Sequence, residues 1–465
     1  MRRLRTLVFV VVLACLVACG GGGGRSSSLR MHVCGSASGP VFQALRDRYP
    51  IVQYRSTQLL RPGSLVVVDG ATTPPAQLGG FEGIDRAFAS GASVLILNAT
   101  GAHKSALANA SQRIGAYVNG DHSAYFITPI GKNGVDIVHA GPTTRRVKTH
   151  YSRLTDEGLL TGSPTEKVIR LDLNQASIQN FVTLVDQRLR GNMPRSRDSG
   201  TDPPSSVPRY IASITDSFID NGNILPGQTL TQNVTFFFNV YENDGGPGKQ
   251  FQWLSAYATG LSDPGSPSAD DDRTRGYFQT SCEVSFSPDP NGNGELLNVF
   301  SYGPQASAES YEAYLAFPIE YDGGAQTYNY QLALPGPQQQ SIPGWEVGPV
   351  SAEAPNGQAL WFFQTDPYEI GDWHDGFSHG GLVLDWKVKD MNTTSITQFP
   401  LYCGVVFLTT FVTPTAIVMQ YSVGSTYDRL HSHEKSPGIY DREHTPVTTE
   451  PGDPSSLTLL FGRAS

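Results

Sequence analysis

The periodicity of apolar residues changes once along this chain of 465 residues, across a proline-rich segment at residues 191–209. That segment holds four prolines and no apolar period, so it predicts a linker between domains. Before it, short apolar runs alternate with segments of helical period; after it, apolar and polar residues alternate with a period of two. Because helices and strands differ in period, we expect two domains of different class, at 31–190 and 210–465.

The first of these domains is expected to be α/β. Apolar runs at 31–34, 64–68, 93–97, 124–128, 135–139 and 168–173 predict strands, and segments at 81–89 and 103–113 predict helices between them. Asn174 is placed to cap a further helix with an apolar stripe. Near-continuous apolar strands that alternate with helices indicate a mostly parallel sheet covered on both faces, and this pattern resembles a flavodoxin-like or Rossmann-like domain.

The second domain is expected to be an antiparallel β-sandwich or barrel. Strand patterns recur at 234–240, 276–286, 358–364, 382–388, 401–412, 416–423 and 456–461, and clusters of Gly, Pro, Asn and Asp separate them.

The N-terminus carries a targeting pattern. A basic start and an apolar stretch at 7–18 lead to Leu16-Val17-Ala18-Cys19, which resembles the lipobox of bacterial lipoproteins. The resemblance implies that residues 1–18 are a signal peptide and that Cys19 is acylated, with palmitate among its acyl chains. Residues 19–30, rich in Gly and Ser, then form a tether. We expect a lipid-anchored protein of the bacterial cell envelope, at the outer membrane.

Composition narrows the range of partners. The net charge is −9, and no concentrated basic face is visible, which argues against nucleic acid as a partner. No cofactor motif is complete. The pair His431 and His433 has a spacing compatible with zinc, but its surroundings are polar and turn-rich, so no metal site is expected.

Two cysteines of the second domain predict a disulfide. Cys282 and Cys403 lie in the same half of the chain, and the envelope is an oxidising compartment that allows them to pair.

One motif points to an enzyme. Gly376-Phe377-Ser378-His379-Gly380 matches the G-x-S-x-G pattern of α/β-hydrolases, in which a strained strand-to-helix turn exposes the serine. Here the flanking residues predict strands on both sides, and no oxyanion loop precedes the motif. We therefore expect no catalytic residue, with a lipase- or esterase-like envelope hydrolase that uses Ser378 as the alternative.

A hairpin at 311–334 is the most specific candidate for membrane contact. Apolar and aromatic residues alternate along both arms, around a turn at Asp322-Gly323-Gly324. The arms approach the nine to eleven residues with which a strand crosses a bilayer. The same pattern suits a half-buried hairpin, and Pro318 favours an edge position. The candidate membrane-facing residues are Leu315, Phe317, Ile319, Tyr328, Tyr330 and Leu332.

Two short segments extend this interpretation. Trp345-Glu346-Val347-Gly348 and Leu384-Asp385-Trp386 are similar to segments of the leukocidin and cytolysin class of β-pore-forming toxins. The resemblance implies a membrane-interacting β domain, while the lipid anchor and the absence of a long Gly/Ser-rich stem depart from it. The leading hypothesis is a non-enzymatic, lipid-anchored surface lipoprotein whose β domain binds a protein, glycan or lipid ligand.

Overall fold

The structure is a computed structural model. It describes residues 29–56, 60–78, 83–111, 113–131, 134–150, 152–155, 158–191, 210–244, 250–263, 265, 277–294, 297–303, 316–322, 327–333, 345–353, 358–365, 399–409, 416–436, 439–444 and 447–460.

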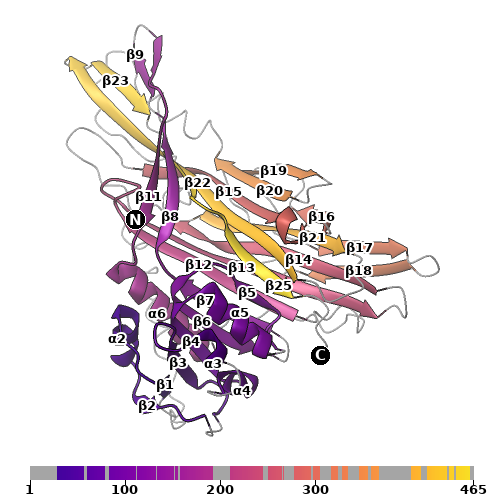
Figure 1. The fold of residues 1–465 in the computed structure, drawn as a ribbon. Coiled ribbons are helices and arrows are strands. Elements are labelled where there is room, and N and C mark those ends of the chain that lie inside the picture. The colour runs from indigo at the N-terminus through magenta and orange to yellow at the C-terminus, as the bar shows by residue number, and fades with distance from the viewer. Residues whose placement is uncertain are drawn as a thin grey trace, which may run out of the picture.

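One large sheet runs through both halves of the chain (Figure 1). In spatial order its strands are β16 (Asn298–Gly303), β21 (Phe399–Thr409), β14 (Gln250–Asp263), β13 (Thr229–Asp244), β12 (Tyr210–Asn221), β7 (Gly134–Ala140), β6 (His122–Ile130), β4 (Ser93–Ala99), β3 (Leu65–Asp69), β1 (Met31–Cys34) and β2 (Ile51–Gln53). The predicted strands of the first half therefore form, and most of them share this sheet.

The sheet is parallel over only part of its width. Strands β2, β1, β3 and β4 are parallel neighbours, whereas β6 pairs antiparallel with both β4 and β7. The expectation of a mostly parallel arrangement holds for the first four strands and not for β6. Only three residues separate β6 from β7 in the chain, which allows an antiparallel pair but is too short for a parallel crossover.

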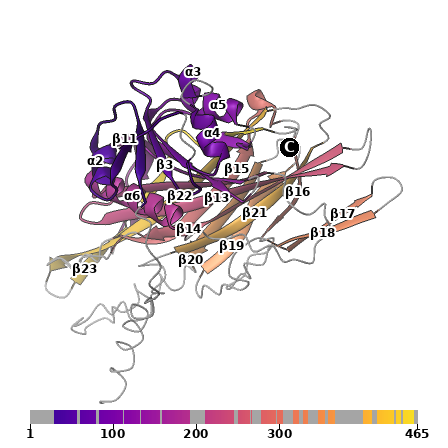
Figure 2. The same ribbon diagram turned by 90° about the horizontal axis from the view of Figure 1, so that it is seen from below.

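Helices cover both faces of the sheet at its parallel end (Figure 2). They are α2 (Pro40–Arg46), α3 (Pro75–Leu78), α4 (Ile84–Ala89), α5 (Gly101–Ala110) and α6 (Gln175–Leu189). The predicted cap of the last helix is confirmed, because the side chain of Asn174 accepts a hydrogen bond from the Ser177 amide at 2.8 Å.

The second large sheet lies against the far end of the first. Its main path is β10 (Gly158–Thr161), β9 (Ser152–Thr155), β23 (Ile439–His444), β22 (Ala416–Ser436), β15 (Tyr277–Pro288), β20 (Gln358–Thr365) and β19 (Trp345–Glu353). The other members are β5 (Ala116–Val118), β8 (Thr143–Thr149), β11 (Thr165–Leu171), β24 (Val447–Pro451) and β25 (Ser455–Leu460). Strand β11 was expected beside the parallel strands, but it pairs with β8 here.

The two halves of the chain are joined by strand pairing at several places. Strand β12, the first after the proline-rich segment, pairs in parallel with β7. Strands β5, β8 and β9 pair with β25, β24 and β23 from the C-terminal end. The domain boundaries remain a prediction, and the described strands show that the segments 31–190 and 210–460 share both sheets.

The hydrophobic core also contains residues from both halves of the chain. One cluster runs from Phe88 of α4 through Phe236 of β13 to Trp361 of β20, so helices at one end and the second sheet at the other cover the same face of the first sheet. A separate cluster packs α2 and α6 against the opposite face, with Leu45 and Val182 fully buried. The outcome is a mixed architecture, with parallel strands and helices in the first half and antiparallel strands in the second.

A third, two-stranded sheet stands apart from both large ones. It is the hairpin of β17 (Ala316–Asp322) and β18 (Thr327–Ala333), at one end of the molecule in both ribbon views, while β23 lies at the other end. A 3-10 turn, η2 (Pro290–Gly292), completes the described elements.

Candidate functional site

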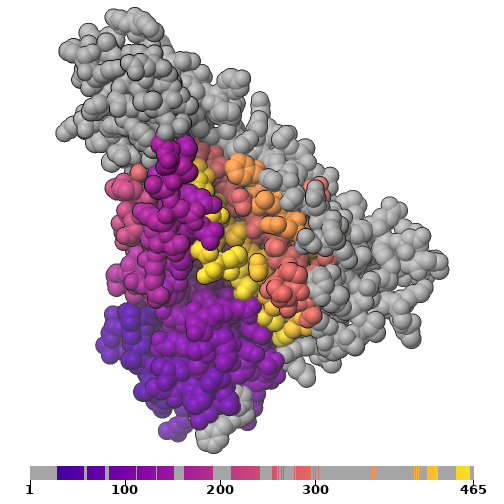
Figure 3. All heavy atoms as spheres, turned by 45° about the horizontal axis from the view of Figure 1, so that its top comes forward, coloured from indigo at the N-terminus to yellow at the C-terminus, as the bar shows by residue number. Residues whose placement is uncertain are grey.

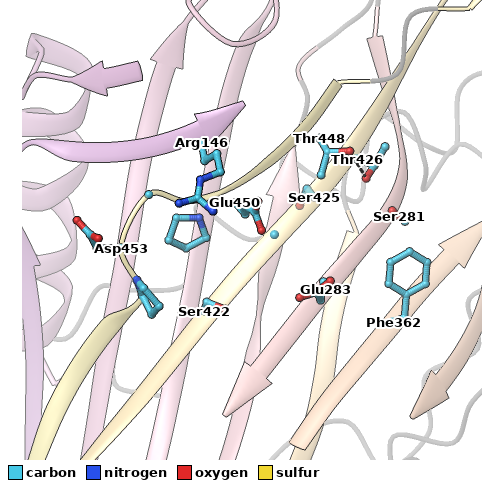
Figure 4. Close-up of a pocket in the computed structure, with 14 residues that line it drawn as sticks. Arg146, Ser281, Glu283, Phe362, Ser422, Ser425, Thr426, Thr448, Glu450 and Asp453 are labelled. Atoms are coloured by element: carbon cyan, nitrogen blue, oxygen red, sulfur yellow. Dashed lines mark hydrogen bonds between the residues drawn. The ribbon is translucent and has the colours of Figure 1, made fainter. Parts of the chain in front are cut away.

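A groove of about 420 Å³ lies on the outer face of the second sheet (Figure 4). Strand alternation decides which side chains reach it. In β15, Cys282 and Val284 point into the core, so Glu283 between them faces outward. In β22, Tyr421 and Val423 belong to the core in the same way, which leaves Ser422 on the outer face.

The groove is organised by one row of residues across five neighbouring strands. Register places Phe362 of β20 opposite Glu283, and Glu283 opposite Gly424 of β22. On the other side of β22, Ser425 pairs with Thr449, so Gly424 lies next to Glu450 of β24, which in turn lies opposite Arg146 of β8. The row is Phe362, Glu283, Gly424, Glu450, Arg146, and all five residues line the groove.

Gly424 makes the middle of this row hollow. A Cβ atom built on Gly424 would lie 3.7 Å from Cβ of Glu450 and 3.8 Å from Cβ of Glu283. These are ordinary contact distances, so the fold does not require glycine there. The missing side chain instead leaves open space between the two carboxylates.

Ion pairs compensate some of the charges around the groove. Lys148 Nζ lies 2.8 Å from Glu450 Oε1, and Arg146 Nε lies 3.3 Å from Glu166 Oε1. Among the ion pairs of the described residues, none includes Glu283. Desolvation raises the pKa of the Glu283 carboxyl, and the nearby charge of Glu450 raises it further.

Hydroxyl groups form the polar margin of the groove. Thr426 and Thr448 are hydrogen bonded to each other at 3.1 Å, and Ser422 is hydrogen bonded to Ser285 at 2.7 Å. The space-filling view shows purple segments from the first half of the chain side by side with yellow C-terminal segments, and orange segments beyond them (Figure 3). The groove thus depends on the strand pairing that joins the two halves.

Sequence reasoning did not find this groove. The alternation Ser281-Cys282-Glu283-Val284-Ser285 does indicate a strand with one polar face. The lateral row could not be read from it, because that row depends on the register of five strands separated by up to about 300 residues.

The predicted membrane-facing hairpin forms as a pair of strands. Its register sets Phe317 opposite Leu332, Ile319 opposite Tyr330, and Tyr321 opposite Tyr328. The apolar positions of the two arms are therefore aligned with one another.

The two cysteines predicted to pair are free thiols in the structure, both fully buried. Cys282 is on β15 of the second sheet and Cys403 on β21 of the first, and both belong to the core between the sheets. Burial raises the pKa of the Cys282 thiol to about 12 and raises that of Cys403 as well. The structure thus differs from the predicted disulfide, and pairing in an oxidising compartment remains a prediction.

Other sequence candidates fall partly outside the described residues. Cys19, Leu315 and Ser378 lie outside them. His431 and His433 were expected in a polar loop, but they lie in the long strand β22, opposite Glu443 and Asp441 of β23. In the part of the chain that the structure describes, no group of three metal-ligating side chains gathers.

The described helices are too short or too polar for any of them to cross a bilayer. Neither the protein-family models nor the curated proteins compared with the chain gave a match. Among solved structures, one described as a pore forming protein is similar at 10% identity and a TM-score of 0.30, over 54% of this chain and 95% of its own. Clostridium perfringens delta-toxin is similar at 10% identity and a TM-score of 0.25, over 54% of this chain and 92% of its own.

Proposed function

We propose that this chain is a lipid-anchored protein of the bacterial envelope that acts by binding, and that its hairpin β17–β18 contacts a membrane. The observation that carries the membrane contact is the position of the hairpin in the topology. It leaves β16, the edge strand of the first sheet, and returns to β19, the edge strand of the second, while it pairs with neither. Displacement of the hairpin therefore breaks no ladder hydrogen bonds of the two large sheets.

The segment between β16 and β19 is long enough to form a membrane hairpin. Between Gly303 and Trp345 the chain has 41 residues. Two membrane-crossing strands need about 9–11 residues each, so the segment is long enough for both strands with residues left for the turn and the connections. The aligned apolar positions, with Ile319 opposite Tyr330, would give such a ribbon one continuous apolar face.

The lipid anchor supports the same proposal. Acylation at Cys19 would hold the protein beside a bilayer through the tether at 19–30. In the anchored protein, the segment 31–190 serves as a scaffold. Its strand order β2-β1-β3-β4 supports the proposal of a flavodoxin-like domain there.

A pair of fluorescent probes tests the membrane contact. An environment-sensitive probe is attached to Ile319→Cys or to its neighbour Glu320→Cys, in a background in which Cys15 and Cys19 are alanine. The described native cysteines are buried and compete poorly for the label. With vesicles added, the probe at position 319 should shift to the blue and the probe at 320 should not, because neighbours in a strand face opposite sides.

A control probe at Val168→Cys reports non-specific adsorption, since Val168 is an exposed apolar residue of β11. Spectra that do not change at either hairpin position would contradict the proposal, as would an equal shift at 319 and 168. The anchor is tested separately: Cys19→Ala should abolish uptake of labelled palmitate, and unchanged uptake would exclude acylation at Cys19.

A further inference from the structure

We propose that the groove across the second sheet binds a protonated amine carried on a small hydroxyl-bearing molecule, such as an amino sugar. This inference does not depend on the hairpin, because no residue of the hairpin is among the described residues that line the groove. It rests on the row Phe362, Glu283, Gly424, Glu450, Arg146 and on the charges around it.

The charge of the groove favours a cation. Its lining includes the carboxylates Glu283, Glu450 and Asp453 and a single basic side chain, Arg146. Arg146 is already paired with Glu166, and Lys148 compensates Glu450. Lys148 also attracts the carboxylate of Glu283, but Glu450 raises the pKa of that carboxyl more than Lys148 lowers it, and a bound ammonium group would relieve the repulsion between the two carboxylates. An anionic ligand would meet the same carboxylates and be repelled.

The shape of the groove admits a small group between those carboxylates. Gly424 separates Glu283 from Glu450 across the sheet, and its missing side chain leaves the space that an ammonium group would occupy. In the close-up, Glu283 and Glu450 extend from neighbouring strands on either side of β22 (Figure 4). A metal ion is a poorer occupant, because the described residues offer no cluster of three ligands.

The remaining lining suits a hydroxyl-bearing body attached to the amine. Phe362 lies next to Glu283 in the row, where its ring can pack against an apolar face of the ligand and attract the cation. The hydroxyls of Ser281, Ser422, Thr426 and Thr448 can both donate and accept hydrogen bonds. A purely apolar amine would leave these hydroxyls without ligand partners.

Two sugars that differ in one charge test the proposal. Glucosamine carries a protonated amine, while N-acetylglucosamine has the same ring and a neutral amide. Binding of each to the purified full chain is measured by calorimetry in solution, without membranes. We expect glucosamine to bind at least about tenfold more tightly, since a charge-assisted hydrogen bond is lost with the neutral sugar.

Variants locate the site. Glu283→Gln should weaken glucosamine binding about tenfold or more, and Gly424→Ala should weaken it by filling the space between the carboxylates. Asp172→Asn removes the same charge from an exposed residue whose partner is Arg170, outside the groove lining, and should leave binding unchanged. Affinity should also fall as pH falls through the raised pKa of Glu283, because the protonated carboxyl no longer attracts a cation.

Three results would overturn the inference. They are the absence of glucosamine binding to the wild type, equal affinity for the two sugars, and equal weakening by Glu283→Gln and Asp172→Asn. The last would mean that the general negative charge of the protein attracts the cation. Since no membrane is present, these outcomes leave the proposed role of the hairpin untouched.

Discussion

Arg188 of α6 and Asp136 of β7 form a buried salt bridge, with 2.6 Å between Nε and Oδ2 and side-chain exposures of 6% and 1%. Both partners also reach the strand that follows the proline-rich segment. Arg188 Nη2 donates to Thr215 Oγ1 at 3.2 Å, and Ser213 Oγ donates to Asp136 Oδ1 at 2.6 Å, both on β12. The last helix before that segment is thereby fixed to the first strand after it.

Removal of one partner of this salt bridge should lower the free energy of unfolding. Arg188→Met leaves the Asp136 carboxylate buried without its cation, and we expect a loss of about 3–5 kcal/mol in the free energy of unfolding. Arg190→Met is the matched control at the C-cap of the same helix, since Arg190 is exposed where it pairs with Asp186, and its loss should lower the free energy of unfolding far less. Urea unfolding measures both, and equal losses would mean that the bridge does not hold the two segments together.

Cleavage of the proline-rich segment should not separate the two halves. Trypsin has Arg195, Arg197 and Arg209 available there, and the composition of the segment predicts cleavage. Because β7–β12, β5–β25 and β8–β24 join the halves, the nicked fragments should elute together on size exclusion in native buffer. They should part only in denaturant. Fragments that separate in native buffer would show that the halves are independent domains.

The buried amine of Lys104 should make stability depend on pH. Its Nζ lies 2.8 Å from His122 Nδ1 and donates to the Asn119 carbonyl at 3.2 Å, and burial lowers its pKa from 10.5 to about 7. Between pH 7 and 10.5 the unfolded chain binds a proton here that the folded protein does not. The contribution of Lys104 to the free energy of unfolding therefore increases as pH rises through that window and decreases as pH falls.

Lys104→Met removes this contribution, so its free energy of unfolding should change less than the wild type's between pH 7 and pH 9. Urea unfolding at the two pH values gives the comparison, and Lys167→Met, at an exposed position of β11, is the control. The same pH dependence in Lys104→Met and in the wild type would show that Lys104 is not the responsible group.

The thiols of Cys282 and Cys403 should resist alkylation in the folded protein. Both are fully buried, and their raised pKa values keep them protonated at neutral pH. Labelling followed by peptide mapping checks this, and rapid labelling under native conditions would contradict the packing of the core. In urea without reductant, labelling of both cysteines would exclude the predicted disulfide, whereas labelling only after reduction would confirm it.

The sequence predicted where individual helices and strands lie better than it predicted which strands pair. Apolar runs located β1 and β3, and Asn174 located the start of α6, because these signals are local. The pairing of β8 with β24 joins residues about 300 positions apart, and no local pattern specifies it. Val168 shows the consequence: its apolar run predicts a strand among the parallel strands of the α/β domain, but Val168 lies in the second sheet and is 63% exposed.

The candidate groove could not be predicted for the same reason, because it depends on which strands pair. The polar face of β15 is visible in the sequence, and the glycine of β22 is visible too. Glu283 and Gly424 lie together beside Glu450 only because three strands are aligned in this register. A shift of one residue would turn Glu283 away from the groove. The hairpin β17–β18 was predictable because its two arms are neighbours in the chain and a turn sequence joins them.

Binding to lipid vesicles tests the proposed membrane contact most directly. The Cys19→Ala protein, which lacks the proposed acylation site, should sediment with the vesicles, and Ile319→Arg in that background should sediment far less with an unchanged melting temperature, since an arginine near the bilayer midplane costs about 2–4 kcal/mol. Val168→Arg makes the same change at the exposed apolar position of β11 and should sediment like its parent. A parent protein that does not bind the vesicles, or an Ile319→Arg variant that binds them as well as its parent, would contradict the account.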